Sequence, residues 1–167
     1  PLKFEEGATL EANFSSDNYI GNFVFISPKA SYNRIKLTNL RVEEHTDAKN
    51  FSLRLLADRL SLADSIFVNK VAIENILTND SLTFAIHAAE DQASDRLRLH
   101  GHIHFEHNKP AFIHFNESTI VLNNEPWEIQ ADTEIRVSKG KLYFEQFRFA
   151  QNHENVEFNG ILSNEED

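Results

Sequence analysis

Histidine is the residue type in this chain whose spacing most invites a chemical interpretation. His100, His102 and His104 alternate along one segment, and His107 and His114 follow shortly after. Imidazole nitrogens bind zinc and other transition metals, so such a set could contribute to a metal site. Alternate residues on one strand face lie about 6.6–7 Å apart, however, and no thiol or carboxylate completes the set at a typical spacing. We therefore predict a polar strand face and no metal.

The remaining residue types offer no catalytic arrangement. Asp and Glu alternate with apolar residues or fall in turns, which is typical of a solvated face rather than of paired carboxylates. The five glycines form no nucleophile elbow, phosphate loop or dinucleotide fingerprint. Trp127 follows Pro126, and we interpret it as a core anchor rather than a ligand platform. The sequence predicts no catalytic residue, no cofactor and no enzymatic activity.

Composition sets the class of protein. The 167 residues are 41% hydrophobic and 25% charged, which is typical of a single globular unit over residues 1–167. A formal net charge of −10 repels phosphate backbones, so we predict no nucleic-acid partner. Cysteine is absent, which excludes disulfides and thiolate sites, and no apolar run reaches the ~18 residues of a membrane span. Fourteen phenylalanines with no methionine favour strands over helices.

Turn-forming clusters divide the chain at short intervals. They combine Asn, Asp, Ser, Pro or Gly and lie at residues 15–18, 27–29, 47–50, 79–81, 90–92, 108–110, 123–126, 138–140 and 151–153. The later clusters recur about every fifteen residues, as expected for strands of about ten residues joined by short turns. Such connections are too short for parallel crossovers, so the pattern predicts an antiparallel meander.

Between the turns, apolar and polar residues alternate with the period of a half-buried strand. Leu97, Leu99, Gly101, Ile103 and Phe105 share one face, while the histidines occupy the other. The same alternation recurs at residues 127–131, 135–137, 142–145 and 156–159. Residues 51–63 fit a strand or a helical turn; we interpret them as a strand because β-branched and aromatic residues flank them.

Glycines recur at one place in the alternating pattern. Residues 97–103 and 156–162 each carry a glycine in mid-strand on the apolar side, and residues 19–23 are a looser copy. Ten-residue strands would span roughly 33 Å, longer than the roughly 17–20 Å usual in compact sheets. Long strands with mid-strand glycines favour a wide curled sheet, although the same glycines could mark bulges in an ordinary sandwich.

Several blocks in the second half carry a family resemblance. They are residues 97–105 (LRLHGHIHF), 116–124 (NESTIVLNN), 126–129 (PWEI), 142–147 (LYFEQF) and 156–163 (VEFNGILS). In order and spacing they resemble the TamB family, the inner-membrane component of the translocation and assembly module within the AsmA-like, bridge-like lipid transfer superfamily. In that family a Ser-x-Ile/Val-x-Leu-Asn turn precedes Trp-x-Ile, and a later Gly-x-Leu-Ser ends the unit. The similarity covers residues 96–163 well and the first half only as a strand pattern.

The resemblance implies an all-β fold: a long antiparallel meander curled into a β-taco, a trough-like half-pipe with an apolar interior. It implies a segment of a periplasmic protein of a diderm bacterium, anchored in the inner membrane, that conducts phospholipids between the membranes and supports outer-membrane protein assembly. The implied partners are phospholipid acyl chains, neighbouring segments of the same chain and, through other regions, a TamA-like outer-membrane protein. That family has no catalytic residues to carry over.

Two further expectations concern the ends of the chain and its apolar side. Because the chain opens at Pro1 and closes on acidic residues, we expect a segment excised from a longer protein, whose sheet edges could pair into a dimer. The alternative function is a structural or adhesive β-repeat with a closed core and no ligand. The predicted groove lining is Leu97, Leu99, Ile103, Phe105, Ile113, Phe115, Ile120, Leu122, Trp127, Ile129, Ile135, Val137, Leu142, Phe144, Val156 and Phe158.

Overall fold

The chain forms one large antiparallel β-sheet. The computed structural model describes residues 2–62, 66–89, 95–131 and 133–163, and none of these residues is helical. The first seven strands are β1 (Leu2–Phe4), β2 (Thr9–Ser15), β3 (Ile20–Tyr32), β4 (Ile35–Thr46), β5 (Asn50–Leu62), β6 (Ile66–Thr78) and β7 (Ser81–Ala89). The others are β8 (Asp95–His104), β9 (Ala111–Phe115), β10 (Ser118–Leu122), β11 (Glu125–Ile129), β12 (Glu134–Ser138), β13 (Lys141–Gln151) and β14 (Glu154–Ser163).

The strand order is that of a simple meander. β1 and β2 both pair with β3, β9 and β10 both pair with β8, and β11 and β12 both pair with β13. Each of these couples is one run of chain with an interruption, so the fourteen strands form eleven successive runs, each paired with the next. The predicted antiparallel meander is confirmed, and so is the strand over residues 51–62; Ala63 lies outside the described residues.

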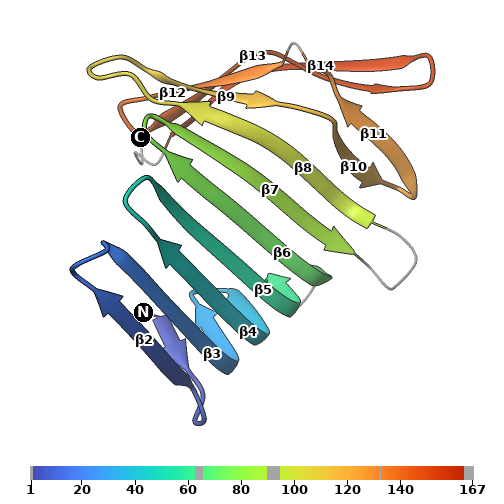
Figure 1. Ribbon diagram of the computed structural model, residues 1–167. Helices are drawn as coiled ribbons and strands as arrows, with labels where there is room; N and C mark the ends of the chain where they lie inside the picture. The colour runs from blue at the N-terminus through green and yellow to red at the C-terminus, as the bar shows by residue number, and fades with distance from the viewer. Residues whose placement is uncertain (1, 63–65, 90–94, 132, 164–167) are drawn as a thin grey trace.

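Figure 1 shows β3 to β8 side by side, with β13 and β14 crossing the top of the view at a large angle to them. The chain therefore changes direction sharply after β8. No helix long and apolar enough to cross a membrane occurs in the part of the chain that the structure describes.

Most predicted turns lie between strands, and left-handed backbone at asparagine supports several of them. Asn79, Asn123 and Asn152 have φ values of 51°, 53° and 49°, a region that Asn tolerates better than most residues. The turn predicted at residues 27–29 is wrong, because these residues lie inside β3. The cluster at residues 90–92 lies outside the described residues.

Residues 27–29 instead belong to a line of irregularity that crosses four strands, which we call the crease. On either side of it, successive residues on one face are three apart rather than two. They are Ser27 and Ala30 in β3, Leu37 and Leu40 in β4, Ala57 and Leu60 in β5, and Val68 and Val71 in β6. Asn39 and Lys70, both with positive φ, supply the extra residue in β4 and β6.

Side-chain hydrogen bonds hold the crease. The fully buried Ser27 hydroxyl donates to the Lys29 carbonyl at 2.7 Å, and the Asn39 amide donates to the Asp58 carboxylate at 2.7 Å across β4 and β5. The phase change keeps the apolar residues on either side of the crease, such as Leu37 and Leu40 in β4, on one face of the sheet. The phase change also explains why the sequence of residues 51–63 fits both a strand and a helical turn. Asp58 lies at the crease, and neither the strand period nor the helical period of apolar residues continues through it.

A second set of breaks interrupts the sheet after β8. β9 ends at Phe115 and β10 begins at Ser118, β11 ends at Ile129 and β12 begins at Glu134, and the β13–β14 register shifts between Phe144 and Phe147. The buried Ser118 hydroxyl accepts the His100 N–H at 2.9 Å and donates to the His100 carbonyl at 3.1 Å. The buried Thr133 hydroxyl accepts the Arg148 N–H at 3.3 Å. The two hydroxyls thus accept the N–H groups of His100 and Arg148 beside the interruptions, and the His100 carbonyl also accepts the Asn116 N–H at 2.8 Å.

Candidate functional site

Cross-strand pairing places the predicted lining residues on one side of the sheet, which we call the apolar face. Directly paired residues of antiparallel strands project on the same side, so each register line can be followed across the sheet. One line runs Leu97, Ile120, Trp127, and another runs Ile103, Ile113, Ile135, Phe144. Pairing or alternation adds Leu99, Phe115, Leu122, Ile129, Val137, Leu142, Val156 and Phe158. Phe105 lies just beyond β8, where its N–H donates to the Asp80 carbonyl at 2.8 Å.

The apolar face also extends through the first half of the chain, where the sequence interpretation named no lining residue. One register line crosses six strands through paired residues: Phe25, Val42, Leu55, Ile73, Ile86 and Leu99. The signal was present in the sequence, because the same period-two alternation runs through β3 to β7. The crease obscured it by shifting the phase in mid-strand.

Burial of the apolar face is uneven. Phe115, Ile129, Ile135 and Phe147 are 5–8% exposed and form a core cluster. Apolar-face residues nearer the margins stay open, with Phe14 76% exposed in β2. Other exposed members of the face include Leu10, Phe51, Leu62, Leu122, Val156, Phe158 and Leu162. The face is therefore covered in one region and open to solvent in others.

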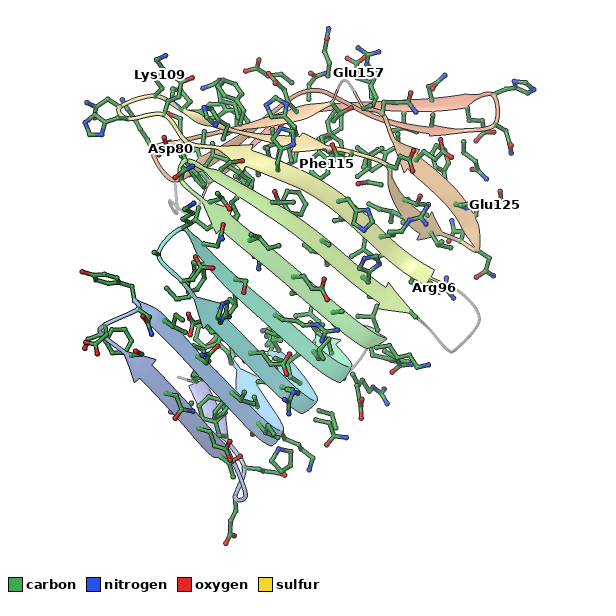
Figure 2. All side chains as sticks on the ribbon, in the orientation of Figure 1. Asp80, Arg96, Lys109, Phe115, Glu125 and Glu157 are labelled. Atoms are coloured by element: carbon green, nitrogen blue, oxygen red, sulfur yellow. The ribbon has the colours of Figure 1, made fainter. Side chains whose placement is uncertain are left out.

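Six phenylalanine rings contact one another in and beside the covered region, with Phe158 at its exposed margin. We call them the aromatic cluster: Phe84, Phe115, Phe144, Phe147, Phe149 and Phe158. Ring centroids are 6.0 Å apart for Phe84 and Phe115 and 5.6 Å apart for Phe115 and Phe147, with interplanar angles of 81° and 89°. The other contacts, at 5.0–5.7 Å, are also edge-to-face. Figure 2 labels Phe115 in the bend where the later strands pass across β8.

The mid-strand glycine of β8 is required by this packing. A Cβ on Gly101 would lie 2.2 Å from the His114 carbonyl oxygen and 2.6 Å from a ring carbon of Phe84. The expectation of a close backbone approach is confirmed at this position. Gly160, paired with Phe144, is less crowded, since its Cβ would lie 3.0 Å from the tip of the Phe158 ring.

Polar residues, among them Glu44, Thr46 and Asn75, interrupt the apolar face of the first half. Glu44 pairs with Phe23 and Leu53, and Asn75 pairs with Leu53 and Phe84. The Glu44 carboxylate accepts a hydrogen bond from the Thr46 hydroxyl on the same strand and face. The lining is therefore not uniformly aliphatic and aromatic, which the sequence interpretation had missed.

The histidines lie on the opposite, polar face, as their alternation predicts. His102 pairs with His114, and the two rings stack with centroids 5.0 Å apart. His100 and His87 place their Nε2 atoms 3.0 Å apart, a hydrogen bond in which one ring donates. His104 is exposed, whereas His100 and His102 are half-buried by these contacts. Among the described residues, no group of three histidine or acidic side chains is close enough to hold a metal ion.

Ion pairs connect neighbouring strands on the polar face. Arg54 contacts Glu74 at 2.8 Å and Glu43 at 3.7 Å, and Arg136 contacts Glu145 at 2.9 Å. In the turns, the N–H groups of Lys49 and Asn50 donate to the Asp47 carboxylate and hold its pKa below its usual value. A hydrogen bond from the Lys109 ammonium likewise lowers the pKa of Glu106.

No family model, curated protein or solved structure matches this chain. The resemblance to the TamB family therefore stays a prediction. The geometry of the two faces carries the functional argument that follows.

Proposed function

We propose that the chain is a lipid-conducting segment of a periplasmic, bridge-like protein of the TamB type, whose apolar face holds phospholipid acyl chains while head groups stay in water. One observation carries this proposal: an unbroken apolar register line crosses β3 to β8 on a face whose margins expose large side chains. Extended exposed apolar surface in a protein commonly marks a site for a ligand, a partner or a membrane.

The energetics of acyl-chain burial agree with such a role. Each methylene removed from water contributes about 0.8 kcal/mol, so a chain of about sixteen carbons gains on the order of 10 kcal/mol on a fully covering surface. Curling of the sheet into a β-taco would supply that cover. The crease and the breaks after β8 support the proposed curl, because interrupted or bulged strands bend more sharply than regular ones.

The resemblance supplies the proposed setting. A full-length protein anchored in the inner membrane would continue the sheet through neighbouring segments, reach a TamA-like partner through other regions and support outer-membrane protein assembly. In this setting the protein has no catalytic role. The length of the acyl chain, rather than the chemistry of the head group, sets the affinity of the apolar face for a phospholipid.

The test uses two neighbouring strand positions on opposite faces. Phe51 lies on the apolar face and is 39% exposed, while Ile76 lies on the polar face of the adjoining strand and is 51% exposed. A photo-crosslinking amino acid at position 51 should capture phospholipid in bacteria, and one at position 76 should not. Phe51→Arg should abolish lipid co-purification seen by native mass spectrometry, and Ile76→Arg should leave it unchanged. Equal crosslinking at both positions, or none at either, contradicts the proposal.

The aromatic cluster favours a second candidate, a structural β-repeat with a closed core. Two of its rings, Phe115 and Phe147, are buried together with Ile129 and Ile135, as in a protein interior. Under this alternative the exposed margins bind nothing. Phe51→Arg would then change neither lipid content nor any other binding property, while the fold persisted.

A further inference from the structure

One carboxylate stands on the apolar face of the first half of the chain. Glu44 is the one charged residue among the apolar-face positions paired across β3 to β7. It is half-buried and lies directly between Phe23 of β3 and Leu53 of β5. A charge at this position departs from the alternation that places every other paired acidic or basic residue of these strands on the polar face.

Glu44 lacks the cationic partner that its neighbour in the sequence has. Glu43, on the polar face, contacts Arg41 at 2.7 Å and Arg54 at 3.7 Å. Glu44 accepts a hydrogen bond from the Thr46 hydroxyl, and within the described part of the chain no Lys, Arg or His forms an ion pair with it. A carboxylate held among apolar side chains without a cation destabilises a fold. Packing within this chain therefore gives no reason for a charge at this position.

Glu44 lies near the margin of the apolar face, one register line from the end of β4 at Thr46. The marginal line also contains Phe14, which is 76% exposed, and Phe51, which is 39% exposed. On the inner side of Glu44 lies the unbroken apolar register line that crosses β3 to β8. A phospholipid whose acyl chains cover that inner line can therefore place its head group beside Glu44 and still reach water at the margin.

We propose that Glu44 binds the ammonium group of an amine-bearing phospholipid of the phosphatidylethanolamine type. This inference rests on the proposed lipid path and names the class of lipid that the path prefers. A carboxylate accepts charge-assisted hydrogen bonds from a primary ammonium, and an aromatic ring such as that of Phe23 attracts cations. The same carboxylate repels the anionic head group of phosphatidylglycerol. The acyl chains supply most of the affinity, and Glu44 adds a preference among head groups.

The test compares short-chain phosphatidylethanolamine with short-chain phosphatidylglycerol, each below its micelle concentration. Titration of the ¹⁵N-labelled chain gives the two dissociation constants, and amide shifts at Phe23, Glu44 and Thr46 locate the head group. The wild-type chain should bind the ethanolamine lipid roughly fivefold more tightly, as expected for one partly exposed ion pair. Glu44→Gln should bring the ratio of the two constants close to one. Glu11→Gln removes the same charge from the exposed polar face of β2 and should leave the ratio unchanged.

A second measurement distinguishes a binding role of Glu44 from a structural one. In the lipid-free chain, Glu44→Leu should raise the melting temperature by a few degrees, because it removes an unpaired carboxylate from an apolar face. A lowered melting temperature would show that the contact with Thr46 stabilises the fold, and it would overturn the proposal.

The binding data also separate this inference from the function on which it rests. If both lipids bind but the wild-type chain and Glu44→Gln show the same ratio of dissociation constants, the role of Glu44 is overturned and the lipid path stands. If neither lipid binds the wild-type chain, the lipid path and the role of Glu44 are overturned together.

Discussion

The two halves of the sheet share one alternation pattern but bury it to different extents. In β3 to β7 the apolar face lies along continuous strands of 9–13 residues. At its margin Phe4 of β1 contacts Phe25 of β3, with ring centroids 4.8 Å apart. In β8 to β14 five rings converge, and Phe84 of the neighbouring β7 completes the aromatic cluster. Period-two alternation thus decides which face is apolar, whereas strand interruptions decide whether that face packs against itself.

The physical reason is the way in which the strands of each half are interrupted. The crease crosses β3 to β6 at small or short side chains, including Ser27, Ala57 and Val71, without ending any strand. After β8, two adjacent runs are each divided into two strands, β9 with β10 and β11 with β12. A split run can redirect its second half, so aromatic rings from β7, β9 and β13 reach one another.

The largest expected effect separates a buried ring from an open one. Phe147→Ala should lower the free energy of unfolding by about 3–5 kcal/mol, because it removes the ring that contacts three others in the aromatic cluster. Phe51→Ala, on the open half, should cost only about 1 kcal/mol. Urea denaturation of both variants measures the difference. Equal losses would mean that the two halves are buried alike, contrary to the comparison.

Glycine substitutions sharpen the same contrast at the next magnitude. Gly101→Ala should destabilise the fold by roughly 2–3 kcal/mol, since the added methyl group meets a backbone oxygen that cannot move away freely. Gly21→Ala should be neutral or slightly stabilising, because its Cβ would contact Phe14 at an ordinary 3.6 Å. Thermal unfolding of the two variants provides the measurement. A Gly101→Ala variant as stable as Gly21→Ala would show that β7 and β9 pack less closely than described.

The buried hydroxyls test the crease against the breaks. Ser118→Ala should cost about 1–2 kcal/mol, because the His100 N–H loses its hydroxyl acceptor, while the His100 carbonyl keeps the Asn116 N–H. Ser27→Ala should cost less, since Ser27 makes one such bond, to the Lys29 carbonyl. Hydrogen exchange at the His100 amide should also accelerate in the first variant. Unchanged exchange there would remove Ser118 from the account of the break.

The fold class and the sides of the strands could be predicted from the sequence because both follow from local periodicity. Asn- and Gly-rich turns at positions such as 123–124 marked the strand ends, and alternation placed Ile103 and Phe144 on the same face. The crease was mistaken for a turn at residues 27–29, since Ser-Pro-Lys is typical of both. Its true signal, apolar residues three apart at the same level of neighbouring strands, becomes visible only once the register is known.

The packing of the aromatic cluster could not be predicted in the same way. It joins residues from strands far apart along the chain, such as Phe84 and Phe115. Local patterns assign a residue to a face but not to its neighbours on that face. Those neighbours depend on the breaks and on the register of every intervening strand.

The smallest expected effect concerns two acidic turn residues, one in each half. Asp47, whose ordinary pKa is 3.8, accepts the N–H groups of Lys49 at 2.7 Å and Asn50 at 2.9 Å, and Glu106, with an ordinary pKa of 4.5, accepts from the Lys109 ammonium. Both pKa values are lowered in the folded chain. Each carboxylate therefore contributes stability above its ordinary pKa and loses it as the pH falls through the lower, folded value.

Salt should separate these two contributions. The backbone donors around Asp47 are fixed by the turn and act at contact distance, so its acid-dependent loss should persist at high ionic strength. The Lys109 side chain is exposed, and its attraction for Glu106 is screened by salt. The measurement is the melting temperature as a function of pH between about pH 6 and about pH 2. We expect Asp47→Asn to reduce the fall in melting temperature toward acid pH at any salt concentration. We expect Glu106→Gln to reduce it only at low salt. If both variants respond to salt alike, the β4–β5 turn is no more rigid than the β8–β9 loop, and the contrast between the two halves does not extend to their turns.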